Sequence, residues 1–436
     1  MTADAISRCI VGNPSCSQSL GAPGVGGSSM AKQSGSTEPA GSSPGKGIAT
    51  IRAAGVPDTP VTNPERLARL AQEWTYLLRV RSRWAFDVEL RKSIAERAVK
   101  DLAGVGVSTK RLRELATAER IEIEVHDWDR TDARICAIHE AACEIPWEYL
   151  LSAGTRAEGR YHSTLISRLF DNGLAQVTPH PPTGMLFVES APGRFWDKYE
   201  FADEEKRISV AIGAIDKPDN DKYRTIVRTP QTSELAKTIH GSRWEAIHVT
   251  GIDTHQAAWI VEDFYVDMKT KNKPLFDTLI DSTGRLPDGM ILREGHESEL
   301  PVPYGDLAKI LVGPTPPRIV TLNLYYSGAR IARELVRNKA HVALGFLDEI
   351  DDEVAELFFQ AFYWNWFHGK DGLILSIPDA FLKAWEAMPS DKVHGTSIVI
   401  WMGRSIFAPG SESIMKSAAR SRSAKKASPR KKRAAR

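Results

Sequence analysis

Cysteine is scarce in this chain, and the usual cysteine patterns of metal sites and disulfide frameworks are missing. The four cysteines among 436 residues are Cys9, Cys16, Cys136 and Cys143, and no two of them form a Cys-x-x-Cys pair. This spacing favours neither a zinc site nor a set of disulfides. We expect Cys136 and Cys143 to be buried structural thiols, and we expect no metal and no cofactor.

Long hydrophobic runs are missing as well. Residues 1–60 lack the apolar core of a signal peptide, and no uninterrupted apolar run is long enough to cross a bilayer. We therefore expect a cytoplasmic protein that has no membrane partner.

The N-terminal segment is poor in residues that could form a core. Residues 1–60 are rich in Ser, Gly, Ala and Pro, so they have too little apolar surface to offset the entropy lost on ordering. We predict a disordered head over residues 1–60. Met30 is an alternative to Met1 as the start of translation.

The C-terminal segment lacks acidic residues. Residues 416–436 contain ten Lys or Arg and no Asp or Glu, so a chain of net charge +2 has a remainder of −8. We predict a disordered basic tail over residues 413–436, which includes Lys425, Lys426, Arg430, Lys431, Lys432 and Arg433. Such a tail can bind nucleic acid weakly and without specificity through phosphate contacts, but a simple solubilising role fits equally well, because no aromatic residue is present to stack on bases.

The rest of the chain contains regular elements. Asn63 followed by Pro64 is typical of a helix start, and apolar spacing predicts helices over residues 64–78, 88–102 and 111–120, which together form a helical entry module at 61–120. Beyond residue 120, strands and helices alternate. The predicted strands lie at 121–125, 185–189, 225–227, 246–250, 318–324, 341–345 and 397–401, and the helices at 202–214, 232–239, 304–311, 329–337 and 351–367.

These strands are apolar without alternation, which is typical of strands covered by helices on both faces. We therefore predict an α/β fold with three layers, a mostly parallel sheet and helices on both faces, over residues 121–412.

Two of the strands end in turns of small residues, where open α/β sheets place their sites. The segments are Ala246-Ile-His-Val-Thr-Gly-Ile-Asp253 and Val320-Thr-Leu-Asn-Leu-Tyr-Tyr-Ser-Gly328. They resemble the two signature segments of CHAT domains, the caspase- and separase-like cysteine peptidases. Further similar segments occur in order along the chain: Pro146-Trp147-Glu148, the acid-rich 202–205, the 288–292 segment, and 351–363. The resemblance implies a caspase-like sheet.

The resemblance also places the catalytic dyad, and its residues are absent. The family's histidine base falls on Ile252, and its cysteine nucleophile falls on Tyr325. Isoleucine cannot accept a proton, and a phenol with a pKa of about 10 cannot replace a thiolate without an activating base. We expect a degenerate pocket formed by His248, Gly251, Ile252, Asp253, Asn323, Tyr325, Tyr326 and Ser327.

Two nearby residues offer an alternative dyad. His255 could act as the base and Ser327 as the nucleophile, although a loop position for His255 and a helix-capping role for Ser327 are the simpler interpretations. His248 matches the family's non-catalytic histidine, and we expect it to be a hydrogen-bonded core residue.

Three functional hypotheses follow. The first is an inactive CHAT-like pseudopeptidase that binds an unidentified protein partner, as in the bacterial defence and effector systems where active members of the family serve. The second is a divergent peptidase that uses His255 and Ser327. The third is an adaptor that is held on nucleic acid by its basic tail.

Overall fold

The computed structural model describes most of the chain between residues 47 and 408. The described residues are 47–81, 87–128, 131–155, 164–175, 180, 183–196, 201–213, 224–268, 279, 286–296, 298–369, 375–388 and 397–408. Residues 1–46 of the predicted head and the whole predicted tail, with its basic residues from Lys425 to Arg433, lie outside this part of the chain. Among these described residues, no helix is long and apolar enough to span a membrane.

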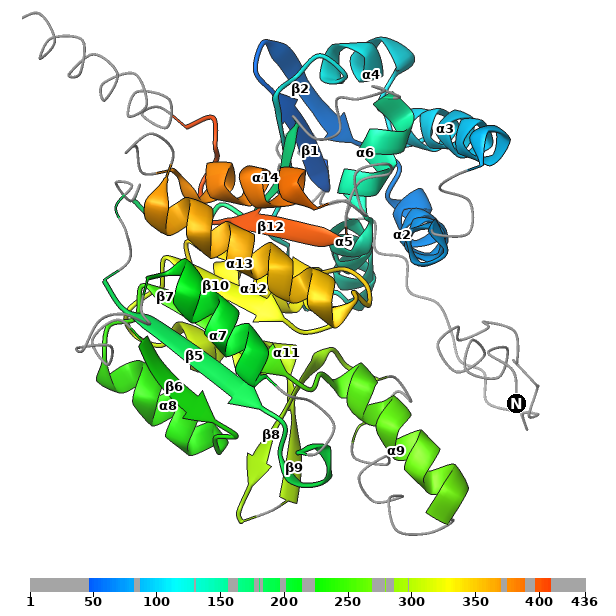
Figure 1. Cartoon of the computed structure of the whole chain (residues 1–436). Coiled ribbons are helices and arrows are strands. Elements are labelled where there is room, and N and C mark those ends of the chain that lie inside the picture. The colour runs from blue at the N-terminus through cyan, green and yellow to red at the C-terminus, as the bar shows by residue number, and fades with distance from the viewer. Residues whose placement is uncertain are drawn as a thin grey trace, which may run out of the picture.

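A ten-stranded sheet forms the middle layer (Figure 1). Its strand order is β2-β1-β3-β4-β12-β11-β10-β7-β5-β6. The strands are β1 (Ala49–Ala53), β2 (Val56–Val61), β3 (Arg120–Val125), β4 (Leu165–Leu169), β5 (Met185–Ser190), β6 (Arg224–Arg228), β7 (Ala246–Gly251), β10 (Ile319–Asn323), β11 (Val342–Phe346) and β12 (Ile398–Met402). A separate hairpin of β8 (Gly289–Glu294) and β9 (Ser298–Pro303) lies between β7 and β10 in sequence.

Most strand pairs are parallel, and the three antiparallel pairs are β1 with β2, β1 with β3, and β11 with β12. Strands β6, β5, β7, β10 and β11 run one way, and β12 pairs with β11 antiparallel. Strands β12, β4 and β3 are parallel to one another and therefore run the other way. The prediction of a three-layer, mostly parallel caspase-like α/β sheet is confirmed.

Helices cover both faces of this sheet. Figure 1 shows α7 (Ala202–Ala211), α13 (Asp352–His368) and α14 (Ile377–Ala387) on the face toward the viewer. The opposite face packs against α2 (Pro64–Arg79), α3 (Val88–Ala103), α4 (Thr109–Leu115), α5 (Ala133–Glu144), α6 (Trp147–Thr155), α8 (Thr232–Gly241), α11 (Tyr304–Val312) and α12 (Ile331–Arg337). The remaining long helix, α9 (Thr254–Met268), follows β7.

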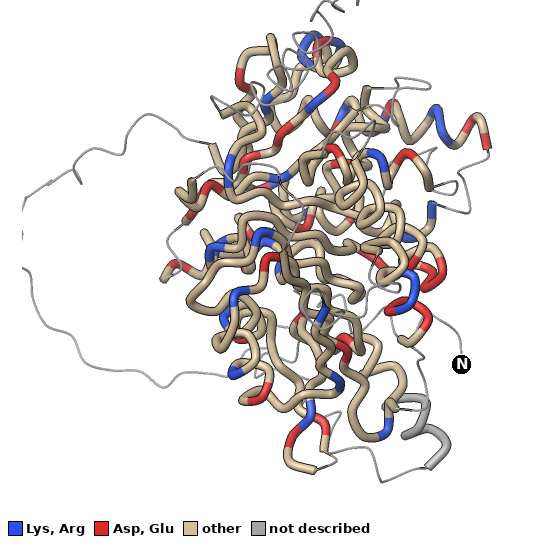
Figure 2. Tube along the Cα trace, turned by 60° about the vertical axis from the view of Figure 1, so that its left-hand side comes forward, with Lys and Arg blue, Asp and Glu red and all other residues tan. Residues whose placement is uncertain are grey.

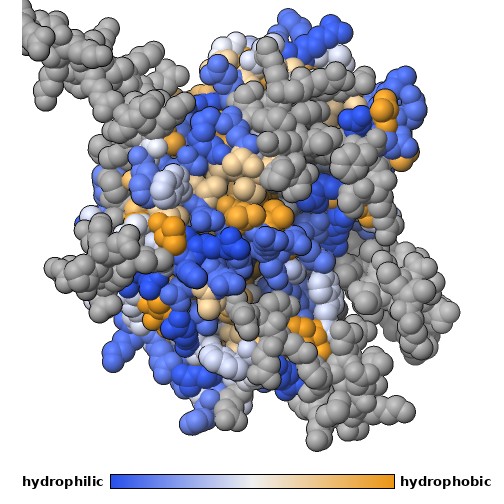
Figure 3. Space-filling view, viewed as in Figure 1, coloured by the Kyte–Doolittle hydropathy of each residue, from blue (hydrophilic) through white to orange (hydrophobic). Residues whose placement is uncertain are grey.

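Alternate residues of each strand join the cores on the two faces. In β7, Ile247 and Val249 join the core on the α8 and α11 side, whereas Ala246 joins the core beneath α7 and α13. Figure 2 shows Lys and Arg interspersed with Asp and Glu over the described part of the chain. The face seen in Figure 1 is largely hydrophilic, with a hydrophobic area near its middle (Figure 3). The absence of alternation in the sequence thus reflects burial on both faces.

The predicted boundary of the disordered head at residue 60 is wrong. Residues 49–61 form the β1–β2 hairpin, and β1 pairs antiparallel with β3. Short segments such as Ala49–Ala53 have no strong pattern of their own, and pairing with a strand about 70 residues later supplies their hydrogen bonds.

The predicted entry module is also not separate from the sheet. Helix α2 packs on α5, and α3 packs on α6, so the boundary at residue 120 divides one packed unit. The third helix ends at Leu115 instead of Arg120, because Arg120 begins β3. Asn63 precedes α2 as predicted, but its side chain donates to the Gly104 carbonyl and does not cap the helix.

A buried ion pair explains the Pro-Trp-Glu segment. Glu148 on α6 accepts hydrogen bonds from Arg168 Nε and Nη2 of β4 at 2.8 and 2.6 Å. Arg168 is fully buried and also donates to the carbonyl oxygens of Cys143 and Ile145. A charged side chain is tolerated in the core because every strong donor of Arg168 has an acceptor.

We expect Arg168→Met to lower the free energy of unfolding by about 3–5 kcal/mol, because Glu148 would remain charged and unpaired in the core. Urea unfolding followed by tryptophan fluorescence measures this loss. Lys309→Met is the control, since Lys309 and Asp306 form an exposed pair worth at most about 1 kcal/mol. Equal losses in the two variants would contradict the structural role given to Arg168.

Candidate functional site

The two signature segments lie on neighbouring parallel strands. Strand β7 pairs with β10, with Thr250 opposite Asn323 and Ile247 opposite Val320. Both strands end at the same edge of the sheet, as the carboxyl ends of parallel neighbours must. Ile252 follows the end of β7 by one residue, and Tyr325 follows the end of β10 by two. The topology therefore brings the two predicted dyad positions to one edge.

Ile252 belongs to a small apolar cluster at this edge. Its side chain is fully buried with Ala191, Phe195 and Ile291. Its backbone is fixed as well, because its N–H donates to the Ser190 carbonyl at 3.0 Å and its carbonyl accepts from Ile291 N at 2.9 Å. No proton acceptor occupies the side-chain position of Ile252.

Tyr325 lies over a different hydrophobic cluster. It is partly buried against the core beneath α7 and α13, and its hydroxyl donates to Asp352 Oδ1 at 3.2 Å. The two side chains at the dyad positions thus pack into separate clusters, although their strands are adjacent.

The glycine before Ile252 is required by close packing of the backbone. A Cβ atom at Gly251 would lie 2.4 Å from the Ser190 carbonyl oxygen and 2.7 Å from Met290 Cε. No other residue fits there without moving β5 or the β8–β9 hairpin, so the small-residue turn at Gly251 is a packing requirement.

His248 is a core residue, as expected. It is fully buried, and its Nδ1 lies 2.7 Å from Thr321 Oγ1 and its Nε2 3.0 Å from Glu204 Oε1. Its ring stacks on Phe187. Both ring nitrogens are therefore used by structural contacts.

Ser327 is held by the backbone and does not cap a helix. Its hydroxyl donates to the Leu324 carbonyl at 2.7 Å and accepts from Phe346 N at 3.1 Å. Helix α12 begins only at Ile331, so the predicted role of Ser327 as the cap of a helix starting near Ala329 is wrong. The hydroxyl ties the end of β10 to the end of β11, and both of its hydrogen-bonding roles are occupied.

His255 lies in the first turn of α9 rather than in a surface loop. Its side chain is partly buried, and its Nε2 lies 2.9 Å from Asp288 Oδ1. Asp288 Oδ2 in turn accepts from Arg330 Nη1 at 3.5 Å, and Arg330 Nη2 donates to Glu144. Burial alone would raise the pKa of Asp288, but the hydrogen bond from His255 and the charge of Arg330 outweigh it and lower that pKa. The His255 imidazole is thus oriented toward a carboxylate, and no hydrogen bond joins it to Ser327 among the described residues.

Tyr326 connects this edge to the N-terminal helices. Its ring lies against the His255 ring, with 4.5 Å between the centroids, and beneath the Arg79 guanidinium at 4.8 Å. Its hydroxyl donates to Glu349 Oε1 at 2.5 Å, and Arg79 pairs with Asp348 at 3.2 Å. The φ angle of Tyr326 is +54°, a conformation that non-glycine residues rarely adopt. The end of α2 therefore covers the turn that follows β10.

Asp253 is a buried N-cap with one unused oxygen. Its Oδ1 accepts from the N–H groups of His255 and Gln256 at the start of α9, at 2.7 and 3.1 Å. Its Oδ2 is buried and has no hydrogen-bond partner among the described residues. Burial raises the pKa of Asp253 to about 7, against the opposing effects of His255 and these backbone hydrogen bonds.

This raised pKa gives a testable dependence of stability on pH. The folded protein holds the Asp253 proton more tightly than the unfolded chain, so the associated stability is full below pH 4 and is lost as the pH rises to about 7. Asp253→Asn keeps the capping oxygen and cannot ionise. We expect the free energy of unfolding of Asp253→Asn, relative to that of the wild type, to rise by up to about 4 kcal/mol between pH 4 and pH 8. About three pKa units correspond to that energy.

Chemical denaturation of both proteins at several pH values measures this difference. Asp351→Asn is a matched control, because Asp351 is an exposed N-cap that accepts from two backbone N–H groups of α13. A stability difference for Asp253→Asn that is independent of pH would contradict the assignment.

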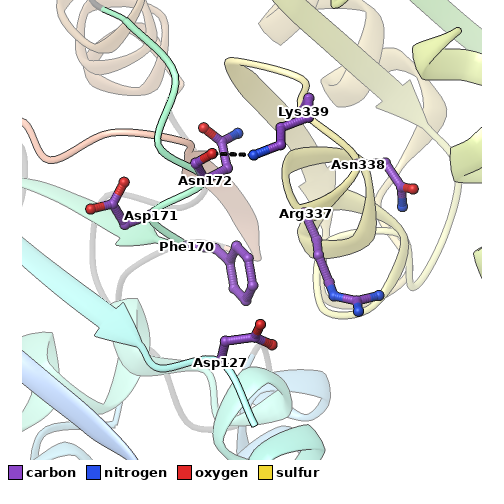
Figure 4. A pocket seen from close by; sticks show the side chains of 7 residues that line it. All are labelled: Asp127, Phe170, Asp171, Asn172, Arg337, Asn338 and Lys339. Atoms are coloured by element: carbon purple, nitrogen blue, oxygen red, sulfur yellow. Dashed lines mark hydrogen bonds between the residues drawn. The ribbon is translucent and has the colours of Figure 1, made fainter. Parts of the chain in front are cut away.

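A separate cavity of about 370 Å³ lies at the opposite edge of the sheet (Figure 4). It is lined by Asp127, Phe170, Asp171, Asn172, Arg337, Asn338 and Lys339. Its polar groups already have partners: the Asn172 amide donates to the carbonyls of Val336 and Ala340, Lys339 donates to the Asn172 carbonyl, and Arg337 pairs with Glu334. These contacts join α12 to the end of β4, so the cavity is a structural junction.

The sequence analysis missed three residues at the dyad edge: Glu204, Asp288 and Arg330. Glu204 and Asp288 stand in segments that resemble the family, but nothing local in the sequence links them to His248 or His255. Among the described residues, no group of three or more His, Cys, Asp or Glu side chains is arranged to hold a metal ion.

The chain matches no protein-family model and no curated protein sequence.

Proposed function

We propose that this protein is a catalytically inactive relative of the CHAT domains, and that it acts as a protein-binding scaffold. The observation that carries the proposal is the state of the base position at the end of β7. Ile252 is fully buried there in an apolar cluster, next to a parallel strand that ends near Tyr325. A dyad needs a proton acceptor and a nucleophile at these two positions, and neither side chain can supply one.

The contacts of Ser327 and His255 argue against a relocated dyad. A serine nucleophile needs a base within hydrogen-bond reach of its hydroxyl. Ser327 instead bonds to the backbone of Leu324 and Phe346, and no hydrogen bond among the described residues joins it to His255, whose Nε2 lies 2.9 Å from Asp288 Oδ1. The fold of a peptidase with its site filled by structural contacts is better suited to binding than to hydrolysis.

The test is a hydrolysis assay with a fluorogenic peptide library, supported by labelling with an electrophilic peptide probe. We expect no cleavage and no labelling by the wild type, His255→Ala or Ser327→Ala. Ser327→Ala should still lower the free energy of unfolding by about 1–3 kcal/mol, because the buried Phe346 N–H loses its acceptor.

Cleavage by the wild type that Ser327→Ala or His255→Ala abolishes would establish the divergent peptidase instead. Cleavage that neither variant affects would also defeat the proposal, and would place the active residues elsewhere.

A further inference from the structure

Glu204 is a buried carboxylate of which only one oxygen is used. It lies in the first turn of α7 and is 1% exposed. Its Oε1 accepts from Asn323 Nδ2 at 2.9 Å and lies 3.0 Å from His248 Nε2. Its Oε2 is buried and has no partner among the described residues. Because an unpaired buried carboxylate oxygen is costly, its presence calls for a ligand.

A second unused polar atom lies at the same strand ends. Thr250 is fully buried, and its Oγ1 has no partner within the described part of the chain. The sheet register places Thr250 between Asn323 of β10, whose amide binds Glu204, and Glu189 of β5. One carboxylate oxygen and one hydroxyl are therefore left without partners in the layer between β7, β10 and α7.

The surroundings of Glu204 are acidic. Its charge contributes to raised pKa values at Glu189, Asp352 and Glu356, for each of which burial is the largest cause. The carboxyl groups of Glu189, Asp352 and Glu356 therefore lie close enough to Glu204 to interact with it electrostatically. Asp352 also accepts the Tyr325 hydroxyl, so the acidic group extends from the buried Glu204 to the surface at the former nucleophile position.

The nearby arginines Arg207, Arg224 and Arg228 are already paired with other carboxylates. Arg207 pairs with Glu356 at 2.9 Å, Arg224 with Glu205 at 3.1 Å, and Arg228 with Glu205 and Glu189 at 2.5 and 3.3 Å. Neither Glu204 nor Asp352 has a Lys or Arg partner among the described residues. The local charge balance is therefore negative and favours a positively charged ligand.

We propose that this group of residues, the Glu204 site, receives an arginine or lysine side chain from a partner protein. The inference rests on the proposed scaffold function and specifies its partner chemistry. A guanidinium carries several donors, enough for Glu204 Oε2, Thr250 Oγ1 and Asp352 together. The ligand enters by displacing the partly buried Tyr325 ring, whose hydroxyl gives up its bond to Asp352.

Glu204→Gln replaces the unpaired oxygen Oε2 and keeps an oxygen at the position of Oε1, which is hydrogen-bonded. In Glu204→Gln, the amide oxygen can keep the bonds to Asn323 and His248, while an NH₂ group replaces Oε2 and repels a cation. Asp203→Asn is the matched control, because it removes one negative charge from the adjacent, exposed position of the same helix. Circular dichroism and thermal unfolding establish that both variants fold.

The probe is the blocked peptide acetyl-Ala-Arg-Ala-amide, with a lysine version and an uncharged citrulline version, titrated into the full chain by calorimetry at low salt. We expect the arginine or lysine peptide to bind the wild type and Asp203→Asn, and to bind Glu204→Gln at least about tenfold more weakly. The citrulline peptide should bind all three proteins weakly.

Failure of this inference can be told apart from failure of the proposed function. Absence of binding to the wild type, or equal binding to Glu204→Gln, would overturn the Glu204 site and leave the scaffold proposal standing. Cleavage of the bound peptide would overturn the scaffold proposal while supporting the site.

Discussion

The antiparallel pairing of β11 with β12 is the constraint on which the rest of the architecture depends. Five residue pairs, from Val342 with Met402 to Phe346 with Ile398, join two sets of parallel strands that run in opposite directions. Because of this reversal, strands β3 and β4 end at the edge opposite to that of β7 and β10. The N-terminal helices pack on the same face as α11 and α12, and their ends reach the segment after β10, where Arg79 lies over Tyr326 and Glu144 pairs with Arg330. The predicted dyad edge is therefore closed by a part of the chain more than 150 residues away in sequence.

The polar groups at this edge are used to hold strands and turns together. His248 joins β7 to Thr321 of β10 and to Glu204 of α7, and Ser327 joins the ends of β10 and β11. His255, Asp288 and Arg330 connect α9, the β8–β9 hairpin and the start of α12. Each of these groups would be costly to bury alone, and the network is stable because nearly all of its members are paired. Residues with catalytic chemistry are thus present, but their geometry is that of a structural network.

The exceptions to this pairing are informative. Glu204 Oε2, Thr250 Oγ1 and Asp253 Oδ2 are buried without partners among the described residues, and they lie at the end of β7 and at the starts of α7 and α9. Unpaired polar atoms in a core are costly, and these three lie at the edge where open α/β sheets bind ligands, although others occur elsewhere in the described chain. The proposed Glu204 site would use two of them, and the raised pKa of Asp253 reduces the cost of burying the third.

The sequence by itself determined the three-layer, mostly parallel sheet, seven of its ten strands and the absence of a base at position 252, because these follow from local apolar patterns and from residue identity. It also determined that residues 246–250 and 318–324 are buried strands that end in small-residue turns. It could not determine the β1–β3 pairing, since a short strand depends on a distant partner for its hydrogen bonds. Only the tertiary structure decided that His255 bonds to Asp288, that Ser327 bonds to the backbone of Phe346, and that Glu204 accepts a hydrogen bond from Asn323 at the end of β10. The Ser327–Phe346, His255–Asp288 and Glu204–Asn323 contacts join residues 19, 33 and 119 positions apart. A side chain's partners across such distances are set by the packing of strands and helices, which no local pattern encodes.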